Sequence, residues 1–177
     1  MNRRLTLEPK DASRLRLVSA DWSDLESLRQ WKNAHARWFF HKDSISVLQQ
    51  REWFIHYLRR EHDYMFLIAT DSGTPSGCLG FRRLDGLLDG YNLIRGTDQS
   101  PRGTMRAALL LMASYAEFTY RDSLRLRVLV GNPALQWYER CGFLVEDQKN
   151  DYVVIKRRGD IVLPEFRLAD AGEIEYA

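Results

Sequence analysis

The stretch that decides the fold runs from Val128 to Phe143 and reads VLVGNPALQWYERCGF. It starts as an apolar strand, passes through Asn132 and continues as a short helix. Tyr138 lies about one and two-thirds turns into that helix, so its hydroxyl can point back toward the strand end. Gly142 permits a left-handed helix stop, after which the chain returns to the core. The spacing predicts that an amide and a phenol meet at the end of a buried strand.

A second informative unit lies just upstream and reads GYNLIRGTDQSPRGTMRAALLL. It predicts a strand over Gly90–Arg95, a polar loop over Gly96–Gly103 and a mostly apolar helix over Thr104–Phe118. Free backbone N–H groups and the helix dipole at such an N-terminus favour an anion. Arg102 and Arg106 could add charge-assisted hydrogen bonds to a diphosphate. Many ordinary loops before helices have this composition, so a purely structural loop stays open.

The remaining pattern supplies strands and helices around these two units. Asp21 or Ser23 can cap a first helix that ends near Asn33, and Ser23 with Glu26 can form a capping box. A second S-x-x-Q box opens a helix at Ser46. The other predicted elements are strands at Ser13–Val18, Tyr64–Thr70, Gly77–Leu84, Leu124–Val130, Phe143–Glu146 and Tyr152–Arg157, and a short helix at Pro133–Cys141. The order β-αα-βββ-α-β-α-ββ predicts an α/β (α+β) fold with a mixed sheet covered by helices.

Composition limits the class of protein. The chain has 177 residues, 45% of them hydrophobic and 28% charged, and a net charge of +2, which suits one folded domain. The charge balance gives no sign of nucleic-acid binding. No apolar run approaches the ~20 residues that span a bilayer, and no secretory signal is visible, so we expect a cytoplasmic protein without a membrane partner. Cys78 and Cys141 form no metal-type cluster with histidines, and we expect no metal.

The first stretch resembles the GNAT superfamily of acyl-CoA-dependent N-acyltransferases, which carry N-x-A-x3-Y-x3-GF after a strand; here the motif runs from Asn132 to Phe143. The resemblance covers about residues 13–157. It implies a GNAT-like, mostly antiparallel central sheet flanked by helices, with two strands splayed into a V-shaped cleft. It also implies direct transfer of an acetyl group from acetyl-CoA to a primary amine. We expect a single acyltransferase domain over 1–158 and a C-terminal tail, 159–177, that docks on this or a neighbouring domain.

The resemblance also assigns roles to residues. Tyr138 is the expected proton donor to the leaving sulfur, and a backbone N–H of Leu93 or Ile94 would polarise the thioester carbonyl. The expected coenzyme A contacts are Leu93, Ile94, Arg102, Gly103, Thr104, Met105, Arg106 and Asn132. The family's usual loop signature is Q/R-x-x-G-x-G/A. Met105 stands where its second small residue is expected, and Gln99 is one residue too far upstream of Gly103.

A finer resemblance lies in the stretches LRQWKNAHARWFF and SISVLQQREWF, which are similar to GNAT enzymes that acetylate nucleotide-linked amino sugars. Ribosomal-protein N-terminal acetyltransferases share part of this pattern. The helix pair that carries it forms one wall of the acceptor pocket in the family. The expected acceptor contacts are Trp31, Asn33, Arg37, Trp53 and Tyr91. Trp31 and Trp53 also fit plain core aromatics at helical spacing.

The sequence leaves the general base open among His35, His41, His56, Glu52 and Glu117. We expect an N-acetyltransferase with acetyl-CoA as co-substrate and a small amine as acceptor, preferably an amino sugar or its nucleotide-linked form. The alternatives are a protein N-terminal acetyltransferase and a non-catalytic GNAT-like domain that binds coenzyme A or regulates. A homodimer is compatible with the sequence.

Overall fold

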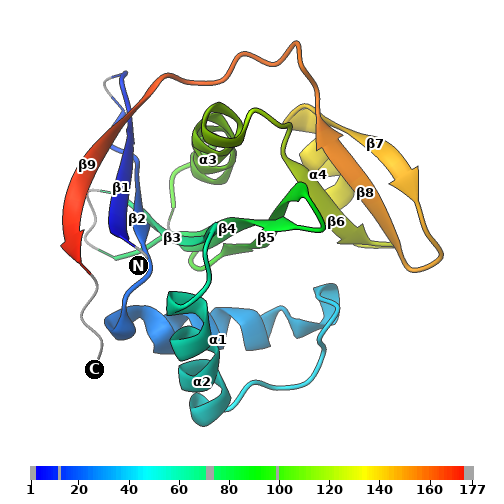
Figure 1. The fold of residues 1–177 in the computed structure, drawn as a ribbon. Helices are drawn as coiled ribbons and strands as arrows, with labels where there is room; N and C mark the ends of the chain where they lie inside the picture. Colours follow the sequence, from blue (N-terminus) through cyan, green and yellow to red (C-terminus); the bar gives the residue numbers. More distant parts are fainter. Residues whose placement is uncertain (1–2, 12, 71–73, 99, 174–177) are drawn as a thin grey trace.

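The computed structural model describes residues 3–11, 13–70, 74–98 and 100–173. The helices are η1 (Trp22–Asp24), α1 (Leu25–Ala34), η2 (Ala36–Trp38), α2 (Val47–Leu58), α3 (Thr104–Tyr120) and α4 (Ala134–Arg140). The strands are β1 (Arg3–Pro9), β2 (Arg16–Ser19), β3 (Asp63–Ala69), β4 (Gly77–Leu84), β5 (Leu87–Arg95), β6 (Arg125–Leu129), β7 (Phe143–Gln148), β8 (Tyr152–Arg157) and β9 (Phe166–Glu173). Figure 1 shows that the strands form one twisted sheet and that the helices lie against it.

The sheet has nine strands in the order β7-β8-β6-β5-β4-β3-β2-β1-β9. Every neighbouring pair is antiparallel except β5 and β6, which run parallel and are joined by α3. A parallel pair needs a crossover connection, and α3 is that crossover. The predicted mixed, mostly antiparallel sheet flanked by helices is confirmed.

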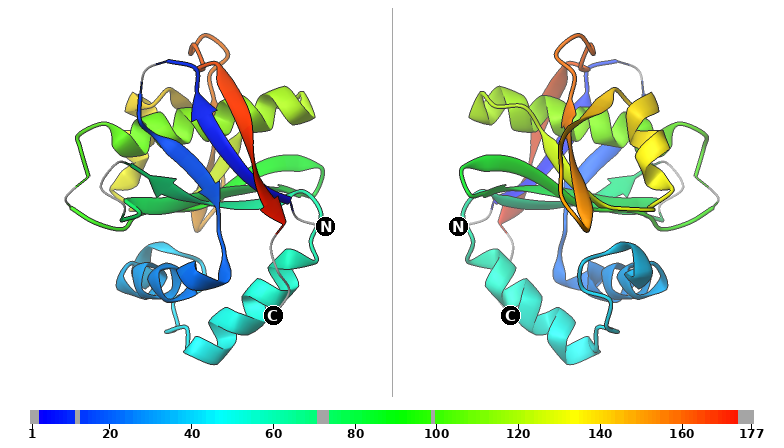
Figure 2. Two further views of the ribbon diagram at one scale, coloured as in Figure 1. Left: turned by 90° about the vertical axis from the view of Figure 1, so that its left-hand side faces the viewer. Right: turned by 90° about the vertical axis from the view of Figure 1, so that its right-hand side faces the viewer.

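Helices cover both faces of the sheet. α3 lies on one face, and α1 and α2 lie on the other (Figure 2). Because side chains alternate along a strand, β3 serves both cores. Phe66 and Ile68 join the core under α3, whereas Met65 and Leu67 join the core under α1 and α2. Burial on both faces explains why this strand reads as a continuous apolar run rather than as an alternating one.

Several local predictions are confirmed. β4 occupies the predicted span Gly77–Leu84, and it forms the predicted hairpin with β3. α3 begins at Thr104, as its pattern indicated. At the start of α2, Ser46 Oγ accepts a hydrogen bond from Gln49 N at 3.2 Å, and Gln49 Oε1 accepts one from Ser46 N at 2.8 Å. This reciprocal pair is the predicted capping box.

The first helix begins differently. The capping box forms between Asp21 and Asp24, because the chain starts a 3₁₀ turn at Trp22 before α1. The carboxylate of Glu26 binds Arg29 and Gln30 instead of a cap, so the predicted Ser23–Glu26 box was wrong. The strand predicted at Ser13–Val18 is shifted to Arg16–Ser19, since Ser13 N donates to Asp11 Oδ1 in a turn.

The sequence analysis did not predict β1 or β9, the two strands at one end of the sheet. β1 is a seven-residue strand with a charged start, and β9 follows the segment that crosses α3, where Ser114 Oγ donates to the Pro164 carbonyl at 2.7 Å. β9 pairs antiparallel with β1, in register from Leu5↔Asp170 to Pro9↔Phe166. The side chain of Phe166 contacts Tyr115 of α3, with ring centroids 5.7 Å apart.

Candidate active site

The site lies where β5 and β6 part. Their parallel pairing covers only Asp89↔Arg125 and Gly90↔Leu126, so β5 from residue 91 onward has no registered partner on β6. At the last pair Gly90 leaves room for the Leu126 side chain, because a Cβ on Gly90 would lie 2.4 Å from Leu126 Cδ2. Beyond it the strands splay around a cavity of about 630 Å³. Unpaired strand groups beside a cavity can bind the amides of an extended ligand.

A bulge on the other side of β5 shapes this cavity. The register with β4 jumps from Gly80↔Tyr91 to Cys78↔Ile94, so Asn92 and Leu93 oppose the single residue Leu79. Asn92 takes a left-handed backbone with φ 51° to make the bulge. Bulges re-aim side chains near active sites. Leu93 and Ile94, the expected carbonyl-polarising positions, both line the cavity.

A second cavity of about 410 Å³ continues from the first at the N-terminus of α3. The two share Leu93, Arg95, Ala134 and Tyr138. Gly103 is the N-cap of α3 with φ 89°, and a Cβ there would meet nothing within 4 Å. The backbone conformation rather than crowding therefore requires this glycine. The open N–H groups of the first turn make an anion site.

All five residues expected at the pyrophosphate line this second cavity: Arg102, Gly103, Thr104, Met105 and Arg106. The Arg95 guanidinium fixes the preceding loop by donating to the carbonyls of Thr97 and Asp98 at 3.1 and 3.0 Å. Met105 is half-buried and packs against the core under α3. Gln99, whose spacing departs from the usual signature, lies outside the described residues.

Asn132 and Tyr138 come together at the cleft, as their spacing predicted. Asn132 Oδ1 accepts a hydrogen bond from Ala134 N at 2.9 Å, so the side chain caps the entry into α4 while it lines the larger cavity. Tyr138 is buried, and its ring packs against Trp137 and Phe143. Within the described residues, its hydroxyl has no hydrogen-bond partner. Burial raises the pKa of Tyr138, so the phenol keeps its proton at neutral pH.

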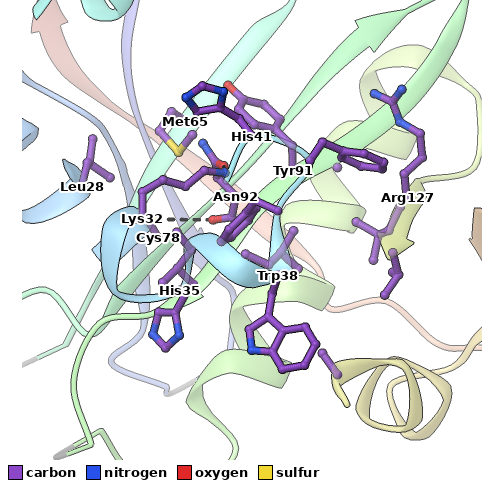
Figure 3. A pocket seen from close by; sticks show the side chains of 18 of the residues that line it. Leu28, Lys32, His35, Trp38, His41, Met65, Cys78, Tyr91, Asn92 and Arg127 are labelled. Carbon is purple, nitrogen blue, oxygen red and sulfur yellow. Dashed lines mark hydrogen bonds between the residues drawn. The ribbon is translucent and has the colours of Figure 1, made fainter. Parts of the chain in front are cut away.

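The acceptor end of the larger cavity is bounded by α1, the segment after it, α2 and the face of β3 to β5 (Figure 3). Lys32 of α1 points into this end and donates to Asn92 Oδ1 at 2.5 Å. The Lys32 ammonium also lies over the Phe39 ring, 3.2 Å from its centroid. The aromatic and apolar lining residues here are Leu28, Trp38, Phe39, Phe40, Trp53, Met65 and Tyr91.

The fixed charge at this end is mostly positive. Asp89 is buried and accepts from two arginines. Arg127 donates to both of its carboxylate oxygens at 3.0 and 2.8 Å, and Arg82 Nε donates to Oδ2 at 3.1 Å. Two guanidinium groups therefore surround one carboxylate, and their excess positive charge faces the cavity that all three residues line.

The five expected acceptor contacts separate into two groups. Trp53 and Tyr91 line the cavity, whereas Trp31, Asn33 and Arg37 do not. Trp31 packs behind the site against the backbone of Gly96, where a Cβ would lie 2.3 Å from the indole. The Asn33 amide exchanges two hydrogen bonds with the backbone of Ile45 at 3.0 and 2.8 Å, which ties the loop after η2 to α1. Arg37 is exposed and stacks on Trp38.

The candidate bases separate in the same way. His35 and His41 line the cavity, whereas His56 and Glu52 of α2 do not. Glu117 lies on α3 and is committed to a buried ion pair with Arg157 and to a hydrogen bond from Leu124 N. Lys32 was missed by the sequence interpretation. Its signal was its place on the apolar stripe of α1, seven residues after Leu25 and four after Leu28, where a charged side chain is unusual.

Two further properties concern the whole described part of the chain. None of its helices is both long and apolar enough to cross a membrane. It also contains no group of three or more histidine, cysteine, aspartate or glutamate side chains arranged to hold a metal ion.

Comparison with known proteins agrees with this geometry. The acetyltransferase (GNAT) domain family matches residues 14–144. Among solved structures, apo FdhC, a nucleotide-linked sugar GNAT, superposes with a TM-score of 0.70 at 16% identity, over 88% of this chain and 90% of that one. Spermidine N-acetyltransferase from Vibrio cholerae, in complex with CoA and spermine, gives 0.68 at 17% identity, over 88% and 95%. A domain from Methanocaldococcus jannaschii DSM 2661 gives 0.66 at 15%, over 88% and 97%.

No curated protein matches the chain. At these identities the solved structures show the fold, and the family match covers most of the sequence. The family match agrees with two features of the structure: the splayed strands β5 and β6, and the N-terminus of α3 beside them. The chain belongs to the GNAT superfamily of N-acetyltransferases.

Proposed function

We propose that this protein transfers an acetyl group from acetyl-CoA to the primary amine of a small anionic molecule, preferably a nucleotide-linked amino sugar. The observation that carries the choice of acceptor is the charge of the cavity. Arg82 and Arg127 outnumber Asp89 there. The guanidinium group of arginine forms paired hydrogen bonds with phosphate oxygens, whereas a cationic polyamine would be repelled by the positive charge of the cavity. The apolar and aromatic walls suit the faces of a sugar ring or a base.

The chain's residues fit coenzyme A at the other end. The N-terminus of α3, Arg102 and Arg106 would hold the diphosphate, and the unpaired edge of β5 after Gly90 would hold the pantetheine arm. When bound, acetyl-CoA supplies the activated acyl group. Alignment of the two reactants contributes most of the rate, since oriented pairs reach effective molarities of about 10⁵–10⁸ M.

Two groups of the chain act on the reacting atoms. A backbone N–H at Leu93 or Ile94 stabilises the negative charge that develops on the carbonyl oxygen. The Tyr138 hydroxyl, which lines both cavities, gives its proton to the leaving sulfur. Asn132 holds the entry to α4 and thereby the position of Tyr138.

A thiol-release assay with acetyl-CoA and a panel of amines tests the proposal. The panel holds a nucleoside-diphosphate amino sugar, the same sugar without its nucleotide, spermidine and a peptide with a free N-terminus. We expect the highest kcat/KM for the nucleotide-linked sugar. Replacing Arg127 with Met should raise the KM for that acceptor about tenfold, the value of one charge-assisted contact, with little effect on the sugar alone. The matched control is Arg167→Met on β9, which lies far from the cleft and should change neither.

Two outcomes would contradict the proposal. A preference for spermidine would show that cationic acceptors are accepted despite the arginines. Acetylation of the peptide alone would favour protein N-terminal acetylation. Calorimetry with acetyl-CoA addresses the non-catalytic alternative, because no binding at high micromolar concentration would refute an acetyltransferase activity.

A further inference from the structure

Lys32 is placed unlike any other lysine of the chain. The chain has five lysines, Lys10, Lys32, Lys42, Lys149 and Lys156. Lys10 and Lys149 pair with carboxylates on the surface at 3.0 and 2.7 Å, and Lys156 pairs with Glu146 at 3.3 Å. Lys32 is half-buried at the acceptor end of the cavity, and within the described residues no carboxylate forms an ion pair with it. Its hydrogen-bond partner among the described residues is the neutral amide of Asn92.

Burial of Lys32 disfavours its charged form, and the Phe39 ring beside its nitrogen opposes this effect. Burial lowers the pKa of Lys32 to about 7, and the Arg82 guanidinium adds to the decrease, while the Cys78 thiol opposes it. The Cys78 thiol stays protonated, because burial raises its pKa to about 12. The other titratable or charged groups that line the cavity are Asp89, Tyr91 and Arg95 of β5, Arg127 of β6, Tyr138 of α4, His35 after α1 and His41 after η2; α2 contributes only Gln49, Gln50 and Trp53. Asp89 is already shared by two arginines.

The contact with Asn92 fixes where the Lys32 nitrogen can act. Asn92 lies in the β5 bulge, next to Leu93 and Ile94, the positions proposed to face the thioester carbonyl. An acceptor amine that attacks this carbonyl must approach from the cavity in which Lys32 and Asn92 meet (Figure 3). The Asn92 oxygen holds the amine of Lys32 in both of its protonation states, because each state still has an N–H to donate.

We propose that Lys32 is the general base that removes a proton from the acceptor ammonium before attack. This inference rests on the proposed N-acetyltransferase function and adds the residue that the sequence left open. Lys32 is neutral in a large fraction of molecules at pH 7, as a base that works at neutral pH must be. Its side chain reaches into the cavity from α1, and Tyr138 of α4 lines the same cavity.

The protons balance over the reaction. Neutral Lys32 takes one proton from the R–NH₃⁺ acceptor and becomes an ammonium. The freed amine attacks the thioester carbon, the new C–N bond forms and the C–S bond breaks. The thiolate receives a proton from Tyr138, and the second nitrogen proton, lost as the amide forms, replaces the proton on the Tyr138 oxygen. Lys32 then releases its proton to solvent, so each turnover yields one amide, one thiol and one H⁺.

Competitive labelling measures the basicity of Lys32 without any acceptor. The protein is treated with trace acetic anhydride from pH 5 to 11, digested, and the modification of each lysine is followed by mass spectrometry. We expect a midpoint near pH 7 for Lys32. Lys149 is the internal control, because the Asp147 carboxylate raises its pKa and places its midpoint above that of an ordinary lysine. Limited access slows the labelling of Lys32 at all pH values equally and leaves its midpoint unchanged.

Two variants separate a base from a charge that binds the acceptor. Lys32→Arg keeps a cation and donors for Asn92 but cannot lose its proton, and Lys32→Met removes both. If Lys32 is the base, both variants lower kcat at pH 7 by about 100-fold, and the kcat profile loses its rising limb near pH 7. The acetyl-CoA Kd should stay within about twofold, which confirms that each variant is folded. Lys149→Arg is the matched control and should keep full activity.

Three results would overturn the assignment. A Lys32 labelling midpoint above about pH 9, close to an ordinary lysine, leaves too little neutral amine. Retention of kcat in Lys32→Arg with a raised KM only in Lys32→Met assigns Lys32 to acceptor binding. Stoichiometric acetylation of Lys32 itself by acetyl-CoA makes it a target rather than a base. Failure of the proposed function would differ from all three, since no amine would be acetylated while the labelling midpoint stayed near pH 7.

Discussion

Replacing Tyr138 with Phe is the sharpest test of the cleft chemistry, because it removes one oxygen and leaves the packing in place. The ring contacts Trp137 and Phe143 at centroid distances of 5.0 and 6.3 Å, and these contacts survive in the variant. The hydroxyl has no hydrogen-bond partner in the described part of the chain. Its loss therefore leaves no buried group unsatisfied, and we expect the unfolding free energy to change by less than about 0.5 kcal/mol.

The effect on catalysis should be much larger. A positioned acid is worth about 10²–10⁴-fold, so kcat should fall by at least about 100-fold, or about 2.7 kcal/mol of transition-state stabilisation. Burial raises the pKa of Tyr138, so the phenol stays protonated across the working range and its deprotonation should produce no falling limb in the kcat profile at neutral pH. Acetyl-CoA binding should persist, since the proposed contacts with the diphosphate come from the start of α3.

Thiol release under saturating acetyl-CoA and acceptor measures kcat, calorimetry measures the Kd, and urea unfolding measures stability. Tyr120→Phe is the matched control. The Tyr120 hydroxyl bonds to His62 Nδ1 at 2.9 Å and to the Tyr64 hydroxyl at 3.0 Å, away from the cleft. That variant should lose about 1 kcal/mol of stability and keep its kcat. A Tyr138→Phe enzyme with unchanged kcat would exclude Tyr138 as the acid, and a large loss of stability would refute the account of its packing.

Three further predictions concern other parts of the molecule. Gly103→Ala places a side chain at φ 89°, which should cost about 1–2 kcal/mol of stability and weaken acetyl-CoA binding; unchanged melting and Kd would refute the strain argument. Replacing both Arg102 and Arg106 with Ala should weaken acetyl-CoA binding at least tenfold at low salt and less at high salt, and a Kd equal to that of the parent would exclude them as diphosphate contacts. Glu117→Gln leaves the buried Arg157 guanidinium without its counter-ion, so urea unfolding should show a loss of about 3–5 kcal/mol with an unchanged acetyl-CoA Kd; a stable variant without activity would instead make Glu117 catalytic.

Local signals in the sequence predicted much of the fold. The β4 span, the start of α3 and the Ser46–Gln49 capping box each depend on residues close in sequence, and each was confirmed. Asp21 was one of the two predicted N-caps, but its box partner Asp24 was missed, because several nearby side chains could accept the same backbone N–H groups and only the direction of the chain into α1 decided among them.

The outer strands could not be predicted in the same way. β1 and β9 pair with one another across more than 150 residues, as the Glu8–Arg167 and Lys10–Glu165 contacts show. Of the two, β9 is the edge strand of the sheet, and its apolar pattern is short and weak. Its stability comes from backbone hydrogen bonds to a partner that the local sequence does not identify.

The sequence by itself indicated the family and the proposed place of the cofactor, because Asn132, Tyr138 and the loop before α3 occupy contiguous stretches whose geometry follows from helix and strand periodicity. Only the tertiary structure decided which side chains face the acceptor. Trp31, Lys32 and Asn33 are adjacent in sequence, yet on α1 one packs behind Gly96, one enters the cavity and one ties down a loop. A helix turns each residue by about 100°, and the surface that each direction meets is set by β4, β5 and the returning loop.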